Sequence, residues 1–246
     1  MYIVSSGRIF GAADDVRSSS LLDSPRVHSI IAPDNHAEWS AMPDHDSHTE
    51  TSRCFATVLF ADIHGFIQMS ERMDPIRLVS TINDWFEMME FIVSANQGTI
   101  DKFVGDCVMA LFGCPRHISD APKKAVQTAI EMRRSLYNFN IEKKLPVPID
   151  LHIGINTGVV VAGMVGGRNK REFTVMGDTV NIASRLEDMS EEGQILVGAH
   201  TYEETKDEYN YRMVGSVPIV GRSKEIAVYE LQPVWNEFKG AKSAGP

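Results

Sequence analysis

The chain has 246 residues, of which 43% are hydrophobic and 23% charged, as is typical of a globular protein with one buried domain and a tail, or with two small domains. Its formal net charge of −9 at pH 7 argues against a nucleic-acid groove, because such a groove needs a basic face. No apolar run approaches the length of a bilayer-crossing helix and no signal-peptide pattern opens the chain, so we expect no transmembrane segment and a cytoplasmic location.

Residues 1–52 are rich in Ser, Asp, His and Pro and show no sustained hydrophobic period. Such a composition cannot build a packed core. We interpret this segment as a tail or linker, or as the remnant of an upstream regulatory region such as a sensor domain.

The first regular elements follow Cys54. The apolar run Phe55–Ala61 predicts a strand that ends in Asp62, followed by a turn and a short helix. Asp74 followed by Pro75 is typical of a helix N-terminus, and apolar residues recur every three or four positions through Ser94. Gly98 is expected to end that helix.

A tight hairpin is predicted next. Two strand-like runs, Ile100–Val104 and Cys107–Phe112, are separated by a Gly-Asp dipeptide, which places Asp106 at the tip. Strict alternation along the first run would put Lys102 on one face together with Ile100 and Val104. Taken alone, the pattern also fits an edge hairpin with a solvated aspartate and a lysine that discourages edge pairing.

The remaining elements alternate between helix and strand, which predicts an α/β fold, an α+β sandwich with helices packed on a mostly antiparallel sheet. The three cysteines contain no Cys-x-x-Cys pair, so we expect them to be reduced. In chain order, the expected elements are a helix over 120–138, a strand over 149–155, a second hairpin arm over 158–167, a strand over 173–176, a helix over 179–189 capped by Asp178, a strand over 194–197, a short helix from 199, and strands over 211–217 and 226–231.

Asp62 and Asp106 are the strongest candidates for chemistry. If their strands are neighbours, the two carboxylates converge, and hard oxygen ligands of this kind suit Mg²⁺ or Mn²⁺ when substrate phosphates complete the coordination. The main-chain amides of Ile63–Phe66 turn into a helix N-terminus and form an anion nest beside them. This arrangement fits nucleotidyl transfer.

Asn181 and Arg185 lie four residues apart on the predicted helix and therefore share a face. An amide and a guanidinium aligned in this way could grip a ligand. An exposed helix face that makes only local hydrogen bonds would show the same pattern.

Three motifs resemble the catalytic domain of class III nucleotidyl cyclases, the adenylyl and guanylyl cyclases. They are Phe60-Ala-Asp-Ile-x-Gly-Phe66, Gly98-x-Ile-x-Lys-Phe-x-Gly-Asp106 and Phe173-Thr-Val-Met-Gly-Asp-Thr-Val-Asn-x-Ala-Ser-Arg-Leu-Glu187. The resemblance covers about residues 53–234 and leaves 235–246 as a C-terminal tail. It implies the cyclase palm fold with a ferredoxin-like core, and a head-to-tail homodimer with two equivalent sites at its interface.

The resemblance also assigns roles. One subunit would hold two Mg²⁺ or Mn²⁺ ions, and its partner would bind the base and ribose of ATP and stabilise the transition state. The residues implied are Asp62, Ile63 and Asp106 for the metals, Ile63, His64, Gly65, Phe66 and Arg222 for the substrate phosphates, Lys102 and Thr174 for the adenine, Asn181 for the ribose, and Arg185 for the charged phosphoryl group.

The implied reaction is attack of the ribose 3′-hydroxyl on the α-phosphorus, giving 3′,5′-cyclic AMP and pyrophosphate. Lys102 can donate to the adenine N1 and Thr174 can accept from the exocyclic amine, whereas guanine carries a protonated N1 and a carbonyl there. Guanylyl cyclase activity and a silent nucleotide-binding or dimerisation module are the alternatives. The Lys102–Thr174 pair also resembles the bicarbonate-responsive subgroup, so direct stimulation by bicarbonate is a further hypothesis.

One position departs from the family pattern. Where the family often has Lys-Gly-Lys, this chain has Val220-Gly-Arg222-Ser-Lys224. Valine cannot approach a phosphate as a lysine does, so we expect Arg222 or Lys224 to replace it.

Overall fold

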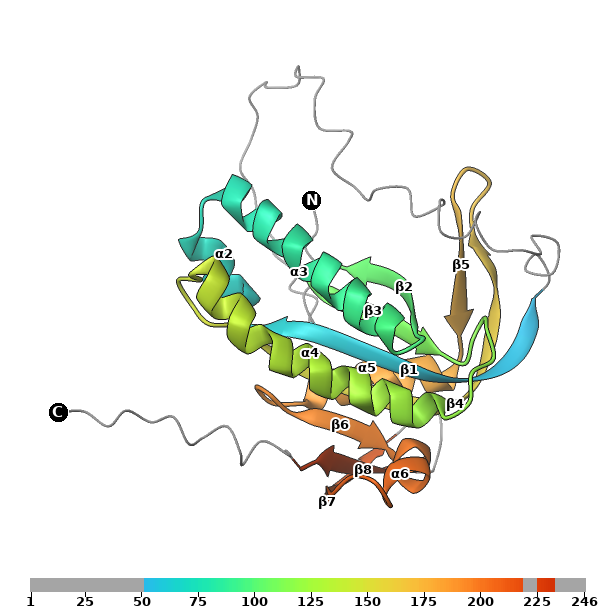
Figure 1. Cartoon of the computed structure of the whole chain (residues 1–246). Coiled ribbons are helices and arrows are strands. Elements are labelled where there is room, and N and C mark those ends of the chain that lie inside the picture. Colours follow the sequence, from blue (N-terminus) through green and yellow to red (C-terminus); the bar gives the residue numbers. More distant parts are fainter. Residues whose placement is uncertain (1–50, 219–224, 233–246) are drawn as a thin grey trace, which may run out of the picture.

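The computed structural model describes residues 51–218 and 225–232. Their strands form one sheet in the order β2-β3-β1-β4-β6-β8-β7, with β5 also paired to β4 (Figure 1). Within these residues, β4–β6 is the single parallel pair. The elements are β1 (Ser52–His64), α2 (Phe66–Arg72), α3 (Pro75–Ala95), β2 (Thr99–Val104), β3 (Cys107–Phe112), α4 (Ala121–Lys143), β4 (Asp150–Gly166), β5 (Arg171–Met176), α5 (Asp178–Met189), β6 (Ile195–Gly198), α6 (Ala199–Thr205), β7 (Tyr211–Pro218) and β8 (Glu225–Leu231).

Strand β1 lies at the centre and buries both of its faces. Leu59 and Ala61 belong to the larger core, which α3 and α4 complete, whereas Ala56 and Val58 pack in a second core with Ala183 of α5. Because successive strand residues point to opposite faces, α3 and α4 cover one side of the sheet and α5 covers the other. The predicted sandwich of helices on a mostly antiparallel sheet is confirmed.

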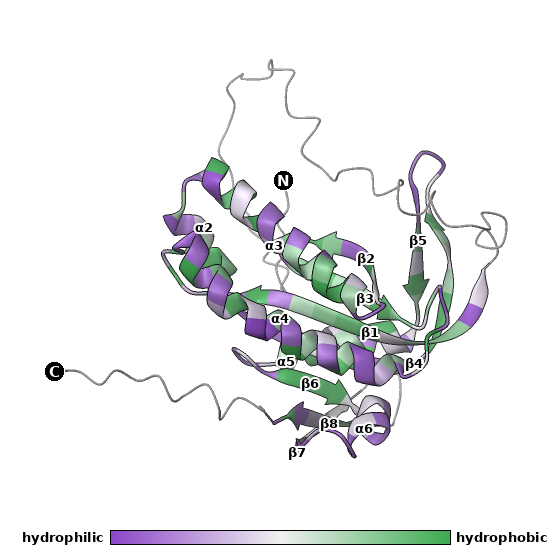
Figure 2. Cartoon of the chain, viewed as in Figure 1, coloured by the Kyte–Doolittle hydropathy of each residue, from purple (hydrophilic) through white to green (hydrophobic). Residues whose placement is uncertain are grey.

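Helix α3 begins as the sequence indicates. The Asp74 carboxylate accepts hydrogen bonds from the main-chain N–H groups of Ile76 and Arg77, and Pro75 occupies the first turn. Trp85 and Met89 on its inner side are fully buried. Figure 2 shows hydrophilic and hydrophobic residues interspersed along α3 and α4, and Ile76 and Phe91 of α3 are exposed.

Strand β4 unites two predicted elements. The expected strand over 149–155 and the expected hairpin arm over 158–167 form one strand of 17 residues, whose second part pairs with β5 as a hairpin. Within this strand, a Cβ on Gly154 would lie 2.2 Å from the main-chain nitrogen of Glu187 in α5. Helix α5 therefore rests directly on the backbone of β4.

The β2–β3 hairpin has the predicted strands but not the predicted faces. Ile100 pairs with Ala110 and Lys102 pairs with Met109, so a bulge at Asp101 breaks the alternation. Ile100 packs on the larger core below α3 and α4, and Lys102 lies on the opposite face. The expectation that Ile100 and Lys102 share a face is wrong.

The expectation of three reduced cysteines is also wrong. Cys54 and Cys114 form a disulfide with their Cα atoms 6.4 Å apart, and Cys107 is free and half-buried. Antiparallel pairing of β1 with β3 brings the start of β1 beside the residues that follow β3. Spacing along the sequence carries no sign of this proximity.

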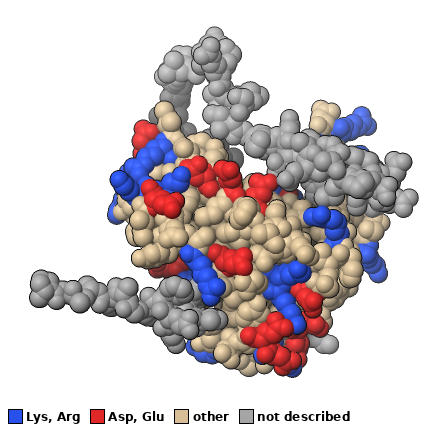
Figure 3. All heavy atoms as spheres, viewed as in Figure 1, with Lys and Arg blue, Asp and Glu red and all other residues tan. Residues whose placement is uncertain are grey.

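Acidic and basic side chains are interspersed among neutral ones on the face that Figure 3 shows, and no single sign of charge covers it. Among the helices that the structure describes, none has both the length and the apolar character needed to span a membrane.

Candidate active site

Asp62 and Asp106 meet at one end of the β1–β3 pair. Asp62 lies near the end of β1, Asp106 lies in the turn between β2 and β3, and the neighbouring residues Ala61 and Val108 are register partners. The two carboxyl groups lie close enough for each to influence the pKa of the other. The predicted convergence of these residues is confirmed.

The environment of this pair disfavours negative charge. Burial first, and then the neighbouring carboxylates, raise the pKa values of the Asp62–Asp106 pair from 3.8 to about 6 and about 7. Glu187 of α5 adds a third acid, whose pKa is raised from 4.5 to about 8 by burial and by the charges of Asp62, Asp188 and Asp106. Two hard carboxylates that repel each other fit a divalent cation, which would offset the repulsion.

This clustering of acids predicts how stability depends on pH without metal. Since the folded pKa values lie above the unfolded ones, the folded chain holds more protons between about pH 4 and about pH 8, so stability falls as pH rises through that window. We expect the Tm in EDTA to decrease across it, and Mn²⁺ to reverse part of the loss at the alkaline end. Differential scanning calorimetry checks this, and a flat or rising Tm in EDTA would contradict it.

The turn after Asp62 is anchored to β4 through two histidines. His64 Nδ1 lies 2.8 Å from His152 Nε2, and His152 Nδ1 bonds the main-chain oxygen of Ser190. Because a carbonyl only accepts, His152 Nδ1 carries the hydrogen, and in the neutral ring its Nε2 accepts from His64. The His64 side chain thus has a structural role, which is to hold this turn against β4. Gly65, with a φ of 85°, turns the chain into α2, whose first residue is Phe66.

The two residues expected to read the base lie together. Thr174 of β5 is buried, and its Oγ1 donates a hydrogen bond to Asp101 Oδ2 at 2.8 Å. Lys102 Nζ lies 3.4 Å from the same oxygen. One carboxylate therefore connects two residues that come from separate segments of the chain.

Helix α5 carries the other two predicted residues. Asn181 is exposed and Arg185 is half-buried. Glu187 is buried and faces the Asp62–Asp106 pair, while the Arg185 guanidinium lies close enough to Asp188 to lower the pKa of that carboxyl against the effect of burial. Gly177 is the N-cap, one residue before the predicted cap Asp178.

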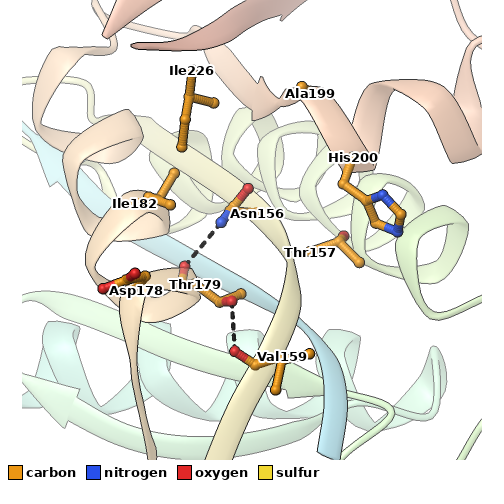
Figure 4. A pocket seen from close by; sticks show the side chains of 9 residues that line it. All are labelled: Asn156, Thr157, Val159, Asp178, Thr179, Ile182, Ala199, His200 and Ile226. Carbon is orange, nitrogen blue, oxygen red and sulfur yellow. Dashed lines mark hydrogen bonds between the residues drawn. The ribbon is translucent and has the colours of Figure 1, made fainter. Parts of the chain in front are cut away.

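A cavity of about 430 Å³ lies beside the start of α5, between β4, α6 and β8 (Figure 4). Asn156 donates from Nδ2 to the main-chain oxygen of Thr179, and Thr179 Oγ1 donates to the main-chain oxygen of Val159. These bonds fix the first turn of α5 on β4 and thereby set the position of Asn181. None of the predicted site residues lines the cavity.

Two residues near the site escaped the sequence analysis. Asp101 escaped because strict alternation turns it away from Lys102, and only the bulge reverses that. Glu187 escaped because it is an acidic residue on a helix, and helical spacing alone does not show that such a residue is buried. Val220, Arg222 and Lys224 lie outside the described residues, as do the expected tails apart from residues 51 and 52.

Comparisons with known proteins agree with this geometry. Residues 49–233 match the model of the adenylate and guanylate cyclase catalytic domain family. Adenylate cyclase 1 of Rhizobium meliloti is 34% identical over 182 residues, 71% of this chain and 27% of that protein. The adenylate cyclase of Anabaena cylindrica is 34% identical over 72% of this chain and 36% of its own length. The chain thus spans about a quarter to a third of these two relatives.

Among solved structures, the adenylyl cyclase CyaB from P. aeruginosa is similar, with a TM-score of 0.71 and 35% identity over 75% of this chain and 96% of that one. The guanylyl cyclase Cya2 has a TM-score of 0.68 and 30% identity over 75% and 93%. The family match over residues 49–233 includes all of the motifs around Asp62, Asp106 and Arg185. The chain belongs to the adenylate and guanylate cyclase catalytic domain family.

Proposed function

We propose that this chain is the catalytic domain of an adenylate cyclase, which converts ATP into 3′,5′-cyclic AMP and pyrophosphate. The observation that carries the proposal is the pair formed by the half-buried Asp62 and the buried Asp106 beside the Ile63–Phe66 turn. Its two carboxylates would hold Mg²⁺ or Mn²⁺, with Ile63 as a further ligand, and the turn would receive the phosphates.

Asp62 and Asp106 would hold two divalent ions, which would lower the pKa of the attacking 3′-hydroxyl and neutralise charge on the phosphates. Among the described residues no cluster of three or more His, Cys, Asp or Glu side chains forms a metal site of protein ligands alone, which is consistent with a site that substrate oxygens complete. Asn181 orients the ribose and Arg185 stabilises the charge that develops on the α-phosphoryl group.

The base preference follows from Lys102 and Thr174. The ammonium donates to the adenine N1, and the hydroxyl accepts from the exocyclic amine. That both residues approach one oxygen of Asp101 supports a shared role, because it places a donor and an acceptor side by side. Guanylate cyclase activity is the alternative, and similarity to Cya2 is the observation that favours it.

One feature supports a homodimer with sites shared between subunits. An apolar face of β1, β4 and β5 is exposed, made by the register partners Phe55 with Val159 and Val161 with Met176. A second copy that covers this face would bury the apolar side chains and complete the site.

The experiment that tests the proposal is an assay of the purified chain with ATP and with GTP, first with Mn²⁺ and then with Mg²⁺, and products are resolved by chromatography. We expect cyclic AMP from ATP and little cyclic GMP. Cyclic GMP as the main product would favour the alternative. Absence of product from both nucleotides, at concentrations where the dimer forms, would favour a silent binding module.

Regulation by bicarbonate and by an upstream sensor domain belongs to the same proposal. The assay at fixed pH, with bicarbonate compared with matched chloride, separates direct bicarbonate stimulation from an effect of pH. Equal rates in both salts would remove bicarbonate as an effector.

A further inference from the structure

One oxygen atom, Asp101 Oδ2, contacts both of the residues assigned to the base. Thr174 Oγ1 lies 2.8 Å from it and Lys102 Nζ lies 3.4 Å from it, while the Asp101 side chain is only 1% exposed. The pKa of Asp101 is raised, because burial outweighs the opposing effects of the Thr174 hydrogen bond and the Lys102 charge. The ammonium beside it stabilises the ionised carboxylate.

The β-bulge explains how Asp101 reaches this place. The register passes from Ile100 with Ala110 to Lys102 with Met109, which leaves Asp101 without a partner on β3. An unpaired bulge residue can direct its side chain beside that of the next residue. Asp101 therefore lies within reach of both Lys102 and Thr174, which comes from β5.

The direction of the Thr174 hydrogen bond has a chemical consequence. A threonine hydroxyl has one proton and two lone pairs, so a free hydroxyl can donate to a carbonyl or accept from an amine. An ionised carboxylate only accepts. With Asp101 as its partner, the Thr174 hydroxyl donates its only proton to the carboxylate. It can therefore offer only lone pairs to a ligand.

We propose that Asp101 is a positioning residue that makes Thr174 an acceptor toward the base, so that the site accepts the exocyclic amine of adenine and rejects the carbonyl of guanine. This inference rests on the proposed function, because it assumes that Thr174 faces the purine. In this inference Asp101 contributes to base selection together with Lys102 and Thr174.

The test measures binding, so that it does not depend on turnover. The probes are 3′-deoxy-ATP, 3′-deoxy-GTP and the 3′-deoxy triphosphate of unsubstituted purine, none of which can cyclise, and each displaces a fluorescent nucleotide in the presence of Mn²⁺. The purine probe keeps the N1 acceptor for Lys102 but lacks the amine. In the unmodified protein we expect 3′-deoxy-ATP to bind about tenfold tighter than the purine probe, the size of one hydrogen bond to the base.

In Asp101→Asn the side-chain amide can donate to Thr174, which frees the hydroxyl to donate outward. We expect the preference for 3′-deoxy-ATP over 3′-deoxy-GTP to fall about tenfold. The control is the same change in a Thr174→Val background, where no hydroxyl remains to be oriented and the preference should not change further. A purely structural role of Asp101 would shift the preference equally in both backgrounds, and this would overturn the inference.

The outcomes also separate this inference from the proposed function. Equal binding of 3′-deoxy-ATP and the purine probe to the unmodified protein overturns the inference, even if the Asp101→Asn protein does not fold and even if ATP is cyclised. The protein could also prefer 3′-deoxy-ATP over 3′-deoxy-GTP in a way that depends on Asp101, yet produce no cyclic AMP. This result would support the inference and overturn the proposed activity.

Discussion

Asp106→Asn is expected to lower cyclic AMP formation by at least about a thousandfold, because metal ions supply several kcal/mol of charge stabilisation and every ~1.4 kcal/mol is a factor of ten in rate. The amide keeps the shape of the side chain but removes the negative charge that would hold the ions. Steady-state kinetics with ATP and Mn²⁺ measure the loss, and it should appear in kcat/KM at every metal concentration that the protein tolerates.

The fold should survive this change. Burial and the charge of Asp62 raise the pKa of Asp106 to about 7, so ionisation of Asp106 opposes folding at alkaline pH. The Tm of the Asp106→Asn protein in EDTA at pH 8 should therefore equal or exceed that of the unmodified protein. Asp84→Asn is the matched control, since Asp84 pairs with Lys143 on the helical face, and it should keep full activity. Near-normal activity of Asp106→Asn would refute the metal assignment.

Two inactive variants should restore activity when they are combined. In a dimer with shared sites, Asp106→Asn damages the half that holds the metals and Arg185→Ala damages the half that stabilises the transition state. A heterodimer of these two chains has one site with both changes and one site with neither. Co-expression with two different tags and purification through both should give about half of the unmodified activity per dimer.

The control for this experiment combines changes in the same half of the site. A heterodimer of Asp106→Asn with Asp62→Asn has one altered carboxylate in each site, so no activity should return. If each chain instead built a complete site alone, the Asp106→Asn and Arg185→Ala heterodimer would stay inactive. That result would refute the shared-site dimer and would leave Arg185 without its assigned role.

Much of this arrangement could be predicted from local patterns. The Gly-Asp dipeptide fixed the hairpin and the place of Asp106, and the Asp74-Pro75 pair fixed the start of α3. The apolar run before Asp62 indicated its strand. These signals depend on residues close in sequence, where turn and cap chemistry act, and that is why they succeeded.

The errors arose where contacts between distant segments decide the structure. The bulge at Asp101 is stabilised by contacts to Thr174 of β5, and no pattern within β2 reveals it. The disulfide of Cys54 with Cys114 likewise depends on the pairing of β1 with β3.

The contact of α5 with Gly154 has a mechanical consequence. Where a helix main chain touches a strand main chain, no side chain can change rotamer to let the helix slide or roll. The distance from Arg185 to Thr174, which pairs with β4 through Gly163, is then set within each subunit. In the proposed dimer each subunit is a rigid half of the site, and a regulator can change the rate by altering the angle at which two such halves meet.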